Sequence, residues 1–204
     1  MEDKPVAYSS FKLFDIQKGF DLTIDEKTNL FSEVKETEMP PSFGELLFYN
    51  LTLANAMDTE KARSELVIAP ILVELRKYMK ETISFFSGAE FTVDSEKGLS
   101  GVCDFLISKS SQIYFIRSPI AAIVEAKNND INQGLGQCFA EMMAAQIFNE
   151  REGTKVPAVY GAVTTADKWK FLKLEGKTAF IDVDDYYLKE HLKKIFGILV
   201  YMVA

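Results

Sequence analysis

The residues best suited to chemistry are Asp104, Glu125 and Lys127, which lie in two segments that otherwise resemble buried strands. Residues 102–107 and 120–126 are apolar, rich in Val and Ile, and bounded by Gly, Ser and Pro. Because side chains alternate across a strand, Glu125 and Lys127 point to the same face of the sheet. An unpaired buried charge is costly, so these groups need partners, solvent or a metal ion. A divalent cation would satisfy Asp104 and Glu125 together, with Lys127 beside it.

The elements before these strands are predicted from periodicity and turn residues. Residues 11–35 alternate weakly and predict one or two short strands. A helix is expected over about 42–57, with Ser42 and Glu45 as a capping box. A second helix is expected from 58 or 59 to about 80, kinked at Pro70.

The elements around and after the two charged strands follow the same signals. Asp130, with Gln133 three residues later, predicts the start of a helix that reaches about 150. The expected strands are 83–93, 100–108, a short one near 112–116, 119–126, a hairpin of 156–164 and 168–174, and 178–182. A final amphipathic helix is expected over 184–203. This order predicts an α/β three-layer core, a central mixed β-sheet flanked by helices.

Length and composition favour a single domain over residues 1–204, with residues 1–40 as an acidic N-terminal extension packed on it. The apolar run 195–204 is too short to span a bilayer, which needs about 20 residues. The N-terminus has no apolar core of a signal peptide. These two features predict a protein without membrane attachment. Cys103 and Cys138 have no metal-ligand spacing, so the cysteines favour a reduced, cytoplasmic protein.

The net charge of −7 is concentrated near the N-terminus. Residues 1–60 contain 5 Lys and Arg against 12 Asp and Glu, whereas the remaining residues are balanced. An acidic chain argues against loose, non-specific nucleic-acid binding, which needs many phosphate contacts. It does not exclude a nuclease, because a bound metal ion brings positive charge to the site itself.

The order of these parts resembles the PD-(D/E)XK nuclease superfamily. Asp104 on one strand, Glu125-x-Lys127 on the next, a following helix that carries glutamines, and a preceding helix with an acid (Glu65 in SELVIAP) all match. Over residues 40–180 the chain is most similar to bacterial proteins related to the N-terminal nuclease region of type I restriction subunits. Cys103 stands where the motif has its proline. The resemblance implies a restriction-endonuclease-like fold.

The resemblance also implies roles for individual residues around Mg²⁺, for which Mn²⁺ can substitute. Asp104 and Glu125 would be the principal ligands, with Glu65 and the backbone carbonyl of Ala126 completing the shell. Lys127 would hold or deprotonate the attacking water and face the phosphate. Gln137, favoured over Gln133, would touch the substrate or brace Lys127.

Each of these assignments has a structural alternative. The two strand carboxylates and Lys127 could form a structural ion pair with an additional edge charge. Glu65 could be a solvated acid paired with Lys61, or a semi-buried one on the face of Ile68. The glutamines could be plain surface residues.

Two further features also have structural alternatives. The lysines between 155 and 177 could be a solvated hairpin or a phosphate-contacting arm, with Trp169 and Phe171 packed in the core. His191 is the one histidine, which sets aside a His-based hydrolase and a His-rich zinc site.

The leading functional hypothesis is a metal-dependent endo- or exodeoxyribonuclease with nucleic acid, DNA above all, as its partner. A nuclease for RNA or a nucleotide, and a non-catalytic partner-binding or regulatory module that keeps the fold, stay open. Superfamily members often dimerise to cut both strands, so a homodimer is also compatible with the resemblance.

Overall fold

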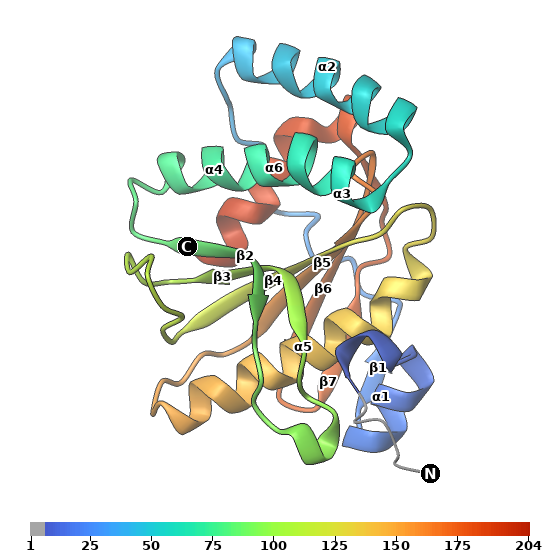
Figure 1. Ribbon diagram of the computed structural model, residues 1–204, viewed down its shortest axis with the longest axis vertical. Helices are drawn as coiled ribbons and strands as arrows, with labels where there is room; N and C mark the ends of the chain where they lie inside the picture. Colours follow the sequence, from blue (N-terminus) through green and yellow to red (C-terminus); the bar gives the residue numbers. More distant parts are fainter. Residues whose placement is uncertain (1–6) are drawn as a thin grey trace.

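A mixed eight-stranded sheet forms the middle layer of the molecule in the computed structural model, which describes residues 7–204 (Figure 1). The strands are β1 (Thr23–Asp25), β2 (Ser84–Glu90), β3 (Val102–Ser108), β4 (Ile120–Ala126), β5 (Val159–Thr164), β6 (Lys168–Glu175), β7 (Thr178–Ile181) and β8 (Tyr186–Tyr187). The helices are α1 (Leu13–Phe20), α2 (Pro41–Met57), α3 (Glu60–Arg63), α4 (Ala69–Tyr78), α5 (Asn132–Arg151) and α6 (Leu188–Val203). Short turns are η1 (Tyr8–Ser10), the π-helical η2 (Ser64–Ile68) and η3 (Ser95–Lys97).

The sheet order is β1-β7-β6-β5-β4-β3-β2, with β8 paired to β6. Strands β2, β3 and β4 form an antiparallel meander, and α5 then crosses to β5, which runs parallel to β4. Strands β5, β6 and β7 are antiparallel, and the short edge strand β1 is parallel to β7. The predicted α/β class with a central mixed sheet flanked by helices is therefore confirmed.

Two apolar clusters separate the layers. On one face, α2, η2, α4 and α6 pack over Phe105, Val124 and Trp169. On the other face, α5 packs over Leu106 and Ile123 and is itself covered by the N-terminal segment that contains α1 (Figure 1). Because both faces are covered, β4 is buried along its whole length. No helix of residues 7–204 has the length and apolarity needed to cross a membrane.

Most predicted elements are present, including the 42–57 helix, the charged strands, the long helix after Asp130 and the 156–174 hairpin. The prediction of strands alone over 11–35 is wrong, because α1 occupies Leu13–Phe20 and turns its one buried side chain, Ile16, towards the core. The predicted strand near 112–116 is also wrong. That segment is an irregular loop with Tyr114 89% exposed.

Three predicted details of the helices also differ. Helix α2 begins at Pro41 with Pro40 as its N-cap, so Ser42 lies inside the helix and makes no capping box. The last helix begins at Leu188 rather than 184, after the short strand β8.

The third difference concerns the helix around Pro70, which divides into α3, η2 and α4, and the π-helical η2 ends at Ile68, two residues before the proline. Proline has no N–H for the Leu66 carbonyl, and Asn50 Nδ2 donates to that oxygen instead, at 2.8 Å.

Helix α5 approaches the N-terminal segment at Gly136. A Cβ atom there would lie 2.5 Å from the carbonyl oxygen of Phe11 and 2.6 Å from the backbone nitrogen of Leu13. Such distances require the backbone of residues 11–13 to move.

We therefore expect Gly136→Ala to lower the free energy of unfolding by about 1–3 kcal/mol in urea titrations. Gly19→Ala is the matched control, because it lies in α1 and an added methyl group there would meet nothing within 4 Å. That variant should keep or slightly raise stability. A Gly136→Ala protein as stable as the wild type would contradict the close packing of residues 11–13 on α5.

Candidate active site

The two strand carboxylates come together where β3 begins and β4 ends. Phe105 pairs with Val124 across the antiparallel ladder, so the preceding Asp104 and the following Glu125 lie at the same end of the sheet. Asp104 is half-buried, and its Oδ2 accepts the backbone N–H of Ala126 at 2.8 Å. Glu125 is 1% exposed. Adjacent antiparallel strands thus place both acids as the sequence predicted, whereas the role of the Ala126 carbonyl as a ligand stays a prediction.

Lys127 lies against Glu125, as expected for residues on one strand face. Its Nζ is 2.5 Å from Glu125 Oε1 and donates to Gln137 Oε1 at 3.3 Å. Gly134 of α5 leaves room for this lysine, because a Cβ there would lie 3.1 Å from Lys127 Cγ and 2.5 Å from Val163 Cγ1. Close packing of α5 on the sheet therefore positions the ammonium group.

Gln137, rather than Gln133, is the glutamine that reaches the lysine. Gln133 is exposed and donates to Asp130 at the start of α5. Asp130 also accepts the backbone N–H of Asn132, which confirms its predicted place at the helix start.

The local charges strongly favour additional positive charge. Burial, with a smaller contribution from the neighbouring Asp104 carboxylate, raises the pKa of Glu125 to about 8 against the opposing effect of Lys127. For Lys127, burial alone would lower the pKa, but the attraction of Glu125 outweighs it and keeps the ammonium charged. Since more than one carboxyl faces this lysine, the site either retains a proton among the acids or takes a cation.

Glu65 does not occupy the semi-buried position that one sequence interpretation gave it. Its side chain is 64% exposed and lies 3.7 Å from Lys61, the pairing that the alternative interpretation predicted. The reason is its place on the outer side of η2, whose buried residues are Val67 and Ile68. Glu65 still lines a pocket of about 260 Å³ that includes Asp104, so its role as a ligand stays a prediction.

Glu60, at the start of α3, was not predicted and acts more directly on the site. It lines the same pocket and raises the pKa of both Glu125 and Lys127. The sequence signal that could have found it is Thr59, whose side chain accepts the N–H of Ala62 and caps the helix. An acid directly after an N-cap lies in the first turn, the part of a helix that favours negative charge.

Glu141 and Arg63 are the other residues that the sequence did not reveal. Glu141 is fully buried on α5, accepts from Gln137 Nε2 at 3.1 Å, and its Oε2 has no partner. Burial raises the pKa of Glu141 well above its ordinary range, and Glu125 adds to the effect. The four-residue spacing from Gln137 in an apolar helix was the available signal.

The buried guanidinium of Arg63 links α3 to the segments that follow β4 and β5. It donates to the Asn128 side chain at 3.0 Å and to the Thr165 carbonyl at 3.0 Å, and it pairs with Asp58 at 3.1 Å. Asn128 directly follows Lys127, so Arg63 holds α3 and its Glu60 beside the lysine. No local sequence pattern distinguishes this arginine from a surface one.

The lysines of the β5–β6 hairpin have acidic partners of their own. Lys168 and Lys170 both contact Asp185 at 2.7 Å. On the opposite face of β6, Trp169 and Phe171 are fully buried. These contacts favour the interpretation of a structural hairpin over that of a phosphate-contacting arm.

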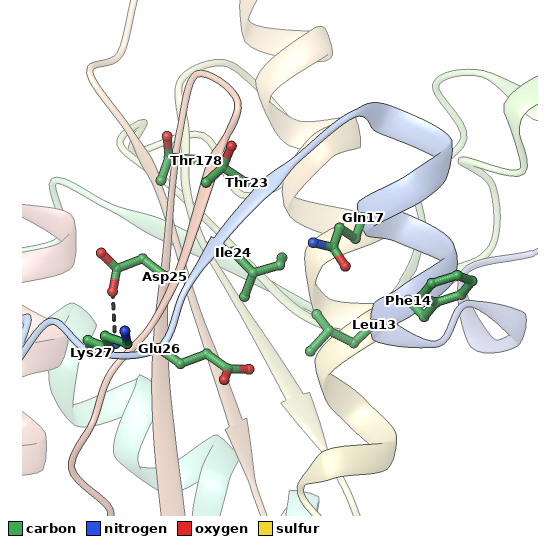
Figure 2. Close-up of a pocket in the computed structure, with 9 residues that line it drawn as sticks. All are labelled: Leu13, Phe14, Gln17, Thr23, Ile24, Asp25, Glu26, Lys27 and Thr178. Atoms are coloured by element: carbon green, nitrogen blue, oxygen red, sulfur yellow. Dashed lines mark hydrogen bonds between the residues drawn. The ribbon is translucent and has the colours of Figure 1, made fainter.

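Neither the volume of a pocket nor a cluster of metal-ligating side chains locates the candidate site by itself. A pocket of about 740 Å³ lies between α1 and β1 at the far edge of the sheet (Figure 2). Its Asp25 carboxylate already accepts the backbone N–H groups of Lys27 and Thr28, so it closes a turn. Within residues 7–204, no group of three or more His, Cys, Asp or Glu side chains has the arrangement of a metal site. Asp104 and Glu125 form the candidate site, since buried charge and convergent polar groups gather there.

The buried acids predict how stability depends on pH. In metal-free buffer, the free energy of unfolding should fall between about pH 5 and about pH 8. The unfolded chain ionises its glutamates above about 4.3, while the folded protein keeps Glu141 and part of Glu125 protonated. Each retained proton contributes at most about 1.4 kcal/mol per pH unit.

Urea titrations across this pH range test the prediction. Glu141→Gln cannot ionise at this position and should show a shallower decline than the wild type. Glu150→Gln, an exposed site on the same helix, should follow the wild type. Equal pH slopes for Glu141→Gln and the wild type would contradict a raised pKa at Glu141.

Comparisons of this chain with protein-family models, with curated proteins and with solved structures found no match.

Proposed function

We propose that this chain is a Mg²⁺-dependent nuclease of restriction-endonuclease-like fold that hydrolyses phosphodiester bonds, most favourably in DNA. One observation carries the proposal. Asp104 and Glu125 converge from adjacent antiparallel strands at one end of the sheet, with Lys127 in contact with Glu125 at 2.5 Å. A structural ion pair needs only one of the two acids.

The connectivity supports the same proposal. A helical segment, the meander β2-β3-β4, the crossover helix α5 and the parallel strand β5 follow one another along the chain. The helical segment, the two charged strands β3 and β4 and the following helix α5 stand in the order that the resemblance to PD-(D/E)XK nucleases implies.

The residues present fit a hard divalent cation. Glu125 Oε2 is buried without a partner, and the Asp104 carboxylate lies beside it with Glu60 nearby. Mg²⁺ prefers oxygen ligands and keeps several waters, so one or two carboxylates and a substrate phosphate can suffice. Asp104 and Glu125 would hold the ion, with the Ala126 carbonyl and either Glu60 or Glu65 completing the shell. When bound, the ion would neutralise charge on the phosphate and lower the pKa of a bound water.

The remaining steps fall to the chain's own side chains. The Lys127 ammonium would donate to a phosphate oxygen or orient the attacking water, since it is held charged by Glu125. Gln137 would keep the lysine aligned through its carbonyl oxygen. The Asp104 carboxylate is oriented by the Ala126 N–H, which limits its rotation.

The substrate and the setting are parts of the proposal. DNA is preferred to RNA or a nucleotide on the resemblance alone, and a homodimer would allow both strands to be cut. The two cysteines are free and buried, which is compatible with a reducing cytoplasm.

One observation favours the alternative, a non-catalytic partner-binding module. The β3–β4 loop exposes three consecutive large apolar residues, Ile113, Tyr114 and Phe115, at the end of the sheet opposite the charged site. Such a cluster is typical of a surface that contacts another macromolecule.

The nuclease proposal predicts cleavage of linear, circular or single-stranded DNA in Mg²⁺ or Mn²⁺. Asp104→Ala, Glu125→Gln and Lys127→Ala should each lower the rate by about 10²–10³-fold, because each removes charge from the reacting centre. Gel assays with parallel RNA substrates measure the rate and the preference.

Lys97→Ala is the matched control, since Lys97 is an exposed lysine paired with Asp94. It should cut like the wild type. Wild-type protein that neither cuts any substrate nor binds Mg²⁺ in calorimetry would contradict the nuclease proposal and favour the binding module.

The two candidate acids of the helical segment can be separated by metal affinity. We expect Glu60→Gln to weaken Mg²⁺ binding several-fold, because Glu60 interacts with Glu125. Glu65→Gln should have a smaller effect, because Glu65 is exposed and faces Lys61. Isothermal titration of both variants with Mg²⁺ decides between them, and a larger loss for Glu65→Gln would reverse the assignment.

A further inference from the structure

A chain of hydrogen bonds leads from the candidate site into the apolar layer under α5. Glu125 Oε1 contacts Lys127 Nζ, which donates to Gln137 Oε1, and Gln137 Nε2 donates to Glu141 Oε1. The two α5 residues are four positions apart and therefore lie on one helix face. Glu141 is the innermost link and is fully buried.

Burial of the Glu141 carboxyl group lowers the stability of the folded protein. Its Oε2 has no hydrogen-bond partner, and its neighbours Cys138 and Met142 belong to the apolar cluster between α5 and the sheet. Tyr8 and Cys103 are close enough for Glu141 to raise their pKa, but the Tyr8 hydroxyl already donates to the Phe91 carbonyl. A leucine or methionine would serve core packing without the desolvation cost of a carboxyl group.

The contact with Gln137 indicates what the carboxyl does. A glutamine amide has an accepting end and a donating end, and rotation of the amide exchanges them. An oxygen acceptor at Glu141 holds the NH₂ end inward, which leaves the carbonyl end for the Lys127 ammonium. The reversed amide would present N–H groups to a cation, which is unfavourable.

We propose that Glu141 is a positioning residue that fixes the orientation of the Gln137 amide and thereby holds Lys127 in place for chemistry at the Asp104 and Glu125 site. The catalytic part of this inference rests on the nuclease function proposed above. The orientation of Lys127 does not, so it can be tested independently.

Three variants isolate the role. Glu141→Met removes the acceptor and fills the apolar space, and Glu141→Gln keeps an oxygen that can accept from Gln137. Glu150→Met is the control, because Gln146 and Glu150 repeat the same glutamine–glutamate pairing at 3.4 Å on the exposed part of α5. Glu141→Met removes the desolvation cost of a buried carboxyl but leaves Gln137 Nε2 without its acceptor, so urea titrations establish that each variant is folded before it is compared.

The direct measurement is the NMR signal of Lys127 in protein labelled with [ε-¹³C]lysine and assigned with Lys127→Arg. Glu141→Met should shift this signal, whereas Glu141→Gln and Glu150→Met should leave it as in the wild type. Gln137→Leu breaks the same chain one link earlier and should shift it too, which keeps the test decisive if Glu141→Met does not fold. An unchanged Lys127 signal in the folded Glu141→Met or Gln137→Leu variants would overturn the inference.

The activity measurement is the cleavage assay under Mg²⁺. Glu141→Met should lower kcat by about 10–100-fold with KM unchanged, as removal of an outer-shell partner typically does, and Glu141→Gln should restore it. Wild-type rates for Glu141→Met would overturn the catalytic role. If the wild type cuts no nucleic acid, the nuclease proposal fails, and the Lys127 signal alone decides whether Glu141 positions the lysine.

Discussion

The burial of Glu125 determines which other groups must lie at the site. A carboxyl that is 1% exposed must be protonated, paired or bound to a cation, because water cannot solvate it. Strand β4 is covered on both faces, so each partner of Glu125 has to come from the neighbouring chain segments. Strand β3 brings Asp104, the end of β4 brings Lys127, and α3 brings Glu60. This end of the sheet is polar because the buried Glu125 carboxyl needs these partners.

Helix α5 contributes the remaining polar groups near the site. Gly134 on the helix and Gly161 on β5 let the helix approach the sheet closely, and a Cβ at Gly161 would lie 2.5 Å from Met142 Sδ. At this distance Gln137 reaches Lys127, while Glu141, one turn further, is enclosed in the apolar layer. The close packing of α5 on the sheet therefore also brings Gln137 and Glu141 towards the site.

The cations near this site are paired with acids or polar groups. Lys168 and Lys170 neutralise Asp185, and the Arg63 guanidinium is committed to Asp58, Asn128 and the Thr165 carbonyl. A phosphate at the Asp104 and Glu125 end would meet Lys127 and also Lys61, which lines the same pocket as Asp104 and lies 3.7 Å from Glu65. This electrostatic balance is what a divalent ion would correct, and it explains why the net charge of −7 does not argue against the proposed chemistry.

The α/β class, the paired strands and the shared face of Glu125 and Lys127 could be predicted from the sequence, because alternation and turn residues are local properties. The sequence also identified Gln137 through its place in the helix after the second strand. It misread residues 11–35, where Ile16 is the one buried position of α1 and the weak alternation matches a strand as well as a helix. The exposure of Glu65, the positions of Glu60 and Arg63 beside the candidate site and the burial of Glu141 became visible in the folded molecule alone. Those outcomes depend on how α3, α5 and the N-terminal segment pack against strands far away in the chain, and no local pattern encodes such contacts.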